Sequence, residues 1–83
     1  MDAEALEREI RRFLSDELRL DAADIARDGE LVSTGLIDSA DLVRLATHVE
    51  RKLGIAIPDR DITAEHFDSI AKILDYVDAR RGS

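Results

Sequence analysis

Residues 35–55 read GLIDSADLVRLATHVERKLGI, and the apolar residues of this stretch recur at helical spacing. The pattern predicts a helix that begins at Asp38 or Ser39. Asp38 can accept a hydrogen bond from an unpaired backbone N–H, and Asp41 complements the positive helix end. Gly54 is a suitable C-terminal cap. The predicted buried stripe of this helix consists of Leu42, Val43, Ala46, Val49 and Leu53.

The N-terminal segment predicts another amphipathic helix, which begins near Asp2 and runs to about Leu18. Its opposite face carries Glu4–Arg8 and Glu7–Arg11 pairs at i,i+4 spacing, and we expect this face to be solvated. The predicted apolar stripe is Ala3, Leu6, Ile10, Phe13 and Leu14.

Residues 19–38 lose this periodicity and form a loop that is long for so small a chain. Residues 21–24 can form a short helical turn. We expect the loop to be pinned because its scattered apolar residues enter the core. These residues are Ile25, Leu31, Leu36 and Ile37.

Pro58 stops any helix after the IAIPD segment, and Thr63 caps a short turn. Asp68 or Ser69 caps a last helix, with Arg80 and Arg81 at its negative end. We expect Ile62 and Phe67 in the core, together with Ile70, Ile73, Leu74 and Val77. The predicted fold is therefore all-α: residues 1–83 form a single four-helix domain with three main helices, one short helix, a long first loop and no strands.

The amino-acid composition excludes several classes of site and partner. The 83 residues include no cysteine, so neither a disulfide nor a thiolate metal site is available. A net charge of −7 argues against a nucleic-acid partner and favours docking on basic patches of other proteins. No apolar run is long enough to span a membrane, and the acidic N-terminus is unlike a signal peptide. We expect a cytoplasmic monomer.

Candidate catalytic or metal-binding residues are few. His48 and His66 lie 18 residues apart on different predicted elements and lack metal-ligand spacing. The four glycines do not form a phosphate-binding loop. These observations predict that the chain is not an enzyme and holds no metal.

Ser39 is the remaining candidate, and its simplest role is that of a helix cap. The sequence holds a second Asp-Ser pair, Asp68-Ser69, which we interpret as a cap only. If Asp38-Ser39 is also only a cap, the chain would be a non-catalytic helical adaptor. Context separates the two pairs, since Ser39 follows a long loop and opens the longest internal helix.

The run GLIDSADLVRLATHVERKLGIAIPDRDITAEHFDSIAKILDYV (residues 35–77) resembles the acyl and peptidyl carrier protein family. The resemblance rests on Asp38-Ser39, on the Gly-Ile-x-Ile-Pro-Asp segment at 54–59 and on Phe-Asp-Ser-Ile at 67–70. It implies that Ser39 carries a covalent 4′-phosphopantetheine derived from coenzyme A, with the cargo held as a thioester. It also implies that Asp38 helps to position a phosphopantetheinyl transferase, and that an acyl or aminoacyl ligase or acyltransferase and downstream biosynthetic enzymes are the other partners.

The chain also departs from this family. Ala40 stands where leucine is commonest, which leaves open a carrier that is never modified. Residues 40–53 hold two acids against three bases, whereas fatty-acid carriers have a strongly acidic helix here. This difference favours specialised metabolism or an aminoacyl pathway, including the D-alanyl type. The residues predicted to contact partner enzymes near Ser39 are Ala40, Arg44, Thr47, His48 and Arg51.

Overall fold

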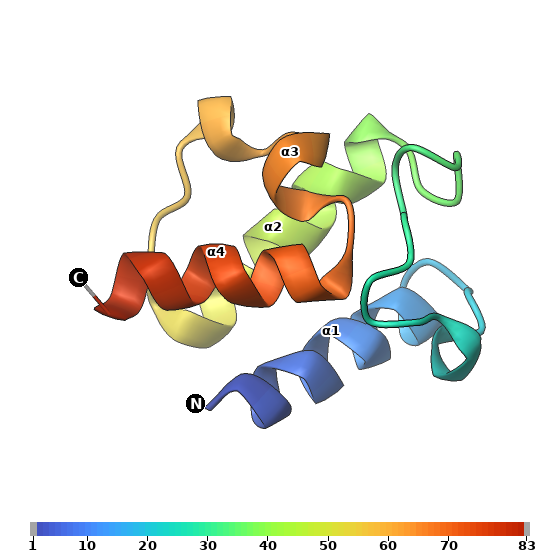
Figure 1. Cartoon of the computed structure of the whole chain (residues 1–83), viewed down its shortest axis with the longest axis horizontal. Helices are drawn as coiled ribbons and strands as arrows, with labels where there is room; N and C mark the ends of the chain where they lie inside the picture. The colour runs from blue at the N-terminus through green and yellow to red at the C-terminus, as the bar shows by residue number, and fades with distance from the viewer. Residues whose placement is uncertain (1, 83) are drawn as a thin grey trace.

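The computed structural model describes residues 2–82, which contain only helices, turns and loops. Figure 1 shows α1 and α4 side by side, with α2 crossing behind α4 and the short α3 beside the start of α4. The predicted all-α fold with three main helices and one short helix is confirmed. The elements are α1 (Ala3–Asp16), η1 (Ala22–Asp24), α2 (Ser39–Leu53), η2 (Asp59–Asp61), α3 (Ala64–Phe67) and α4 (Ile70–Gly82), where η marks a single 3₁₀ turn.

The hydrophobic core lies where α1, α2 and α4 meet, and Phe67 of α3 closes it. The loop between α1 and α2 adds Leu31 and Ile37, both fully or almost fully buried. The buried helical side chains are Leu6, Ile10, Phe13, Leu14, Leu42, Leu45, Ala46, Val49, Phe67, Ile70, Ile73, Leu74 and Val77. A chain this short needs buried side chains from every helix to form its core. The apolar residues that α2 contributes therefore determine which of its faces is turned inward.

Three of the predicted core positions are wrong. Val43 is 50% exposed, and Leu45, which the prediction omitted, is fully buried in its place. Leu36 is 44% exposed, and the adjacent Ile37 is buried instead. Ala3, in the first turn of α1, is also exposed. Ile25, Leu53 and Ile62 are partly buried against the core rather than inside it.

The C-terminal end of α1 explains why this helix is two residues shorter than predicted. The N–H of Leu20 donates to the carbonyl of Leu14 (3.0 Å), so the chain folds back over the last turn of the helix. Arg19, just before Leu20, adopts a left-handed conformation with φ 60°, in which glycine is usual. The chain therefore turns away from α1 directly into η1.

Arg11 fixes the first half of the long loop. Its Nη1 donates to the carbonyls of Ala22 (2.6 Å) and Ile25 (2.8 Å), and its Nε donates to Glu7 (3.0 Å). Glu7 also pairs with Arg27 of the loop (3.0 Å). The prediction of a purely solvated Glu7–Arg11 pair is therefore wrong, because Arg11 is half-buried and satisfies loop carbonyls.

Asp68 fixes the second half of the loop. Its Oδ1 accepts hydrogen bonds from the N–H groups of Leu31, Val32 and Ser33, at 2.7–3.1 Å, and its Oδ2 accepts from the Ser33 hydroxyl. The Ser33 hydroxyl and N–H hold the pKa of the Asp68 carboxyl below its ordinary value of about 3.8, outweighing the opposing effect of burial. The interpretation of Asp68-Ser69 as only a cap is wrong, because Asp68 ties the loop before Ser39 to the start of α4.

Candidate functional site

The N-terminus of α2 is closed by Asp38 rather than by Ser39. Oδ1 of Asp38 accepts a hydrogen bond from the Asp41 N–H (2.8 Å), and the Asp41 carboxylate accepts from the Asp38 N–H (3.5 Å). This reciprocal pair is a capping box, built here from two aspartates. Asp38 therefore has the predicted capping role, and the helix start needs no contribution from the Ser39 side chain.

Ser39 is the first helical residue and is exposed. Within residues 2–82 its hydroxyl makes no hydrogen bond, and the backbone N–H groups of Ser39 and Ala40 also lack a protein partner. Two unpaired N–H groups and the positive end of a 15-residue helix favour a negatively charged group at this point. The position can thus hold a phosphodiester without losing any contact that the fold uses.

The second Asp-Ser pair has the opposite arrangement. Ser69 is buried (4% exposed), and its Oγ accepts a hydrogen bond from the Lys72 N–H at 3.1 Å, which is the bond of an N-cap. Ser69 is thus a cap, as predicted, and has no free hydroxyl. The two pairs differ by one residue in helix register, and only Ser39 has a hydroxyl available for chemistry.

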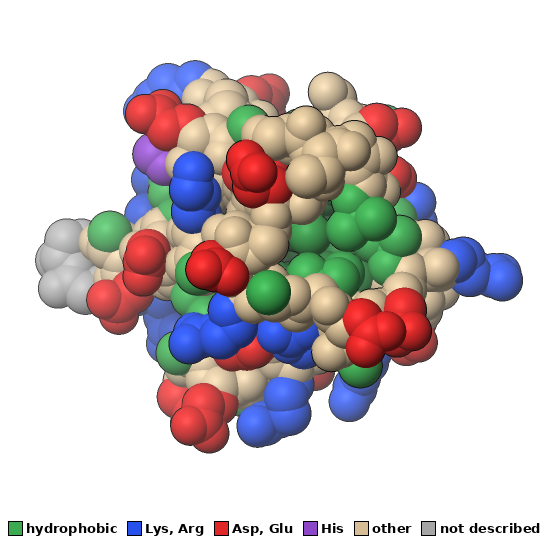
Figure 2. Space-filling model, turned by 45° about the vertical axis from the view of Figure 1, so that its right-hand side comes forward, with side chains coloured by type: hydrophobic (Ala, Val, Ile, Leu, Met, Phe, Trp, Pro, Cys, Tyr) green, Lys and Arg blue, Asp and Glu red, His purple; other side chains and the backbone are tan. Residues whose placement is uncertain are grey.

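Apolar side chains lie on both sides of Ser39. Leu36 precedes it in the loop and Val43 follows it by one turn of α2, and these are the large hydrophobic residues exposed within the described chain. Figure 2 shows hydrophobic side chains gathered in a hollow on one face of the molecule, framed by backbone and polar groups. A group attached to Ser39 would have the exposed apolar side chains of Leu36 and Val43 within reach.

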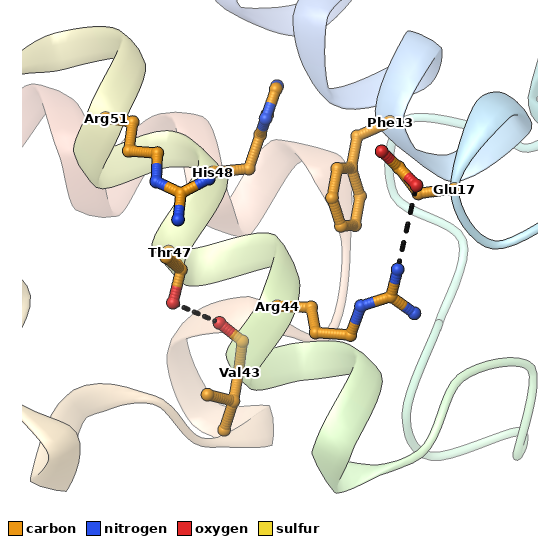
Figure 3. Close-up of a pocket in the computed structure, with 7 residues that line it drawn as sticks. All are labelled: Phe13, Glu17, Val43, Arg44, Thr47, His48 and Arg51. Carbon is orange, nitrogen blue, oxygen red and sulfur yellow. Dashed lines mark hydrogen bonds and ion pairs between the residues drawn. The ribbon is translucent and has the colours of Figure 1, made fainter.

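Four of the five predicted partner residues line one groove of about 300 Å³ between α1 and α2. Figure 3 shows Arg44, Thr47, His48 and Arg51 along α2, with the Arg44 side chain directed toward Glu17 and the Thr47 side chain toward the Val43 carbonyl. Ala40 is exposed but does not line the groove. The remaining lining residues, Phe13, Glu17 and Val43, were not predicted for the site.

The side chain of His48, one of the residues predicted to contact partner enzymes, is only about one-quarter exposed. Its ring lies 4.9 Å from the Phe13 ring, centroid to centroid. Its Nε2 is buried, makes no hydrogen bond within the described chain and lies 3.6 Å from a Glu9 carboxylate oxygen. His48 is therefore part of the contact between α1 and α2, at the floor of the groove.

Most cations of α2 are paired with carboxylates. Arg44 lies 3.7 Å from both Glu17 and Asp41, and Lys52 lies 3.6 Å from Glu9. Arg51 is exposed and makes no ion pair within residues 2–82. The slight positive excess read from the sequence of α2 is thus offset by Glu9 of α1 and by Glu17, which follows α1, whereas Arg51 has no ion-pair partner within residues 2–82.

No group of three or more histidine or acidic residues that could hold a metal ion occurs within residues 2–82. His48 and His66 lie on different helices, α2 and α3. No helix in the described part of the chain is long and apolar enough to cross a membrane.

Comparison with known proteins identifies the family of this chain. Residues 8–77 match the family described as "Phosphopantetheine attachment site". The chain is 32% identical over 74 residues to an acyl carrier protein of Helicobacter acinonychis (strain Sheeba), covering 89% of this chain and 92% of the relative. It is 31% identical, with the same coverage, to an acyl carrier protein of Helicobacter pylori (strain G27). The chain belongs to the phosphopantetheine attachment family, whose members are non-catalytic carriers with covalently bound 4′-phosphopantetheine.

Proposed function

We propose that Ser39 is the attachment site and that the arm carries an acyl or aminoacyl group as a thioester. The observation that supports this proposal is the free Ser39 hydroxyl at the start of a helix that Asp38 already caps. In the loading step, Ser39 Oγ forms a bond to the β-phosphorus of coenzyme A and loses its proton. The pyrophosphate linkage breaks, and adenosine 3′,5′-bisphosphate leaves.

The surroundings of Ser39 fit the attached group. The phosphodiester would face the N–H groups of Ser39 and Ala40, and the α2 dipole would favour its negative charge. The Asp38 carboxylate retains an oxygen, Oδ2, that makes no hydrogen bond within the described chain. That oxygen is available to a phosphopantetheinyl transferase or to its magnesium ion, in agreement with the motif.

The proposed partners are a phosphopantetheinyl transferase, an acyl or aminoacyl ligase or acyltransferase, and downstream biosynthetic enzymes. We assign their docking to Ala40, Arg44, Thr47, His48 and Arg51. The first turns of α2 carry no excess of acidic residues, and this favours a carrier of specialised metabolism or aminoacyl transfer. A partner enzyme whose basic surface is suited to a carrier with an acidic α2 would be only weakly attracted to the α2 of this chain.

Intact-mass spectrometry tests the attachment site. The protein is incubated with coenzyme A, magnesium and a broad-specificity phosphopantetheinyl transferase, beside the variants Ser39→Ala and Ser69→Ala. We expect wild type and Ser69→Ala to gain one phosphopantetheine each, and Ser39→Ala to gain none while keeping its helical circular-dichroism spectrum. A modified Ser39→Ala protein would overturn the proposal.

The alternative of a helical adaptor or unmodified carrier predicts no mass gain in a folded sample. It also predicts that Ser39→Asn has full function, because asparagine caps helices as well as serine does. The structure gives this alternative little support, since the cap of α2 is Asp38 and the Ser39 side chain has no structural contact.

A further inference from the structure

We propose that the groove between α1 and α2 holds the pantetheine arm, and that Arg51 binds a carboxylate at the end of a short acyl cargo. This inference rests on the proposed attachment at Ser39. It names the side of the molecule on which the arm lies and the chemical class of group that it carries there.

The groove lies along a row of side chains that begins at the attachment site. Residues four apart form continuous rows on a helix surface, and the row through Ser39 continues with Val43, Thr47 and Arg51. All three of these residues line the groove. An arm that leaves Ser39 along α2 therefore enters the groove one turn later, without crossing the helix.

The length of the arm matches this row. The extended arm has about 14 bonds from Ser39 Oγ to its sulfur and spans roughly 17 Å at the reach per bond of an extended chain. The 12-residue separation of Ser39 and Arg51 corresponds to about 18 Å along a helix. The thioester would therefore lie beside Thr47 and Arg51, with a short cargo inside the reach of the arginine side chain.

The walls of the groove suit the arm. The gem-dimethyl carbon of the arm is four bonds from Oγ, which places it near the exposed Val43 side chain. The Thr47 hydroxyl donates a hydrogen bond to the Val43 carbonyl (2.9 Å), so this donor is satisfied without a hydrogen-bond acceptor on the arm. Figure 3 shows Val43 and Thr47 on the same side of α2 and Phe13 facing the helix from α1.

The basic side chains in and near the groove determine which charge on the cargo is favoured. Arg44 is engaged by Glu17 and Asp41, and the other nearby basic groups, His48 and Lys52, face Glu9. Arg51 is the groove cation without an ion pair within residues 2–82, and it stands at the end that the thiol reaches. A carboxylate accepts two parallel hydrogen bonds from a guanidinium, whereas the ammonium of an aminoacyl group would be repelled. Among the acyl and aminoacyl cargoes proposed above, the groove thus favours an acyl group with a terminal carboxylate.

The test uses the absence of cysteine from the chain, since the arm then bears the only thiol. Phosphopantetheinylated protein is alkylated with iodoacetate, which leaves a carboxymethyl group, or with iodoacetamide, which leaves a neutral group of nearly the same shape. Backbone ¹H–¹⁵N NMR signals of both forms are compared with those of the unmodified protein at low salt. The variant is Arg51→Gln, and the matched control is Arg8→Gln, an exposed arginine of α1 that does not line the groove.

We expect shifts at Val43, Thr47 and Arg51 in both forms. The shifts of the carboxymethyl form should indicate a docked population that is larger by about 1.4- to fivefold, the range for an exposed ion pair. Arg51→Gln should make the two forms equal, and Arg8→Gln should not. Equal shifts in the wild-type forms, or none in the groove, would overturn this inference. Protein that gains no phosphopantetheine would overturn the proposed function instead.

Discussion

At the scale of single residues, two identical dipeptides perform opposite tasks because they differ by one position in helix register. In the first pair the aspartate caps α2 and leaves the serine hydroxyl free. In the second pair the serine caps α4, and the aspartate is buried against the loop. The chemistry of a serine is therefore set by whether its neighbour has already satisfied the helix end.

This difference predicts unequal effects on stability. Ser39→Ala should change the free energy of unfolding by less than about 0.5 kcal/mol, because an exposed side chain without contacts is lost. Ser69→Ala should cost about 1 kcal/mol, because the Lys72 N–H loses its partner. Urea unfolding followed by circular dichroism would measure both variants. Equal losses would contradict the assignment of the two roles.

Asp68 predicts a dependence on pH. Its pKa is lowered in the folded protein, so the stabilisation is present at neutral pH and is lost as the pH falls below about 4. Asp68→Asn removes charged hydrogen bonds to the loop and should cost about 2 kcal/mol at pH 7. The gap between the unfolding midpoints of wild type and Asp68→Asn should narrow between pH 5 and about pH 3. A gap that stays constant over this range would exclude the proposed carboxylate effect.

At the scale of elements, the ends of the helices show how far the sequence could be interpreted. Gly54 was predicted as the cap of α2, and it adopts the left-handed conformation with φ 66°. The end of α1 could not be placed, because the chain turns at Arg19, which adopts a positive φ without the sequence signal that glycine provides. The type and order of the helices follow from periodicity, but their ends depend on backbone geometry.

Arg19 therefore predicts a stabilising substitution. Arg19→Gly should raise the free energy of unfolding by about 0.5–1 kcal/mol, because glycine adopts positive φ without the steric cost of a Cβ atom. Gly54→Ala should lower it by about 1 kcal/mol for the reverse reason, although a Cβ there would meet no neighbouring atom. Thermal unfolding of the two variants would test this opposition, and a shift in the same direction for both would contradict it.

The proposed site rests in part on the sequence. Ser39 and Asp38 are proposed from the motif, and Arg44, Thr47 and Arg51 from their place on α2, and these roles stay predictions. Val43 and Leu45 could not be distinguished from the sequence, because both are apolar and only the packing of α2 on α1 and α4 decides which is buried. Leu36 and Ile37 lie in a loop without periodicity, so nothing local indicated which of them points inward.

At the scale of the whole molecule, a long loop is held by two polar ties from separate helices. Arg11 of α1 binds the carbonyls of its first half, and Asp68 binds the N–H groups of its second half. Neither role has a sequence signal, since each partner is a backbone group far along the chain. Between them these ties set the path by which the chain reaches Ser39.

Arg11 predicts a coupling between α1 and the loop. Arg11→Gln should lower the free energy of unfolding by about 2 kcal/mol, because two partly buried carbonyls lose a charged donor. It should also accelerate amide hydrogen exchange at residues 22–29 more than in α4. The control Arg12→Gln changes an exposed neighbour and should leave both measurements nearly unchanged. Equal effects of the two variants would contradict the tie.

The placement of the chain ends has a practical consequence. Figure 1 shows the start of α1 and the end of α4 in the left half of the molecule and the start of α2, where Ser39 lies, in the right half. Side chains from the first turn of α1 and from the last turns of α4 line a common small pocket, so the two ends are neighbours. The molecule could therefore be immobilised on a bead or fused into a multidomain chain through either end, and Ser39 would still be exposed on the far side of the molecule.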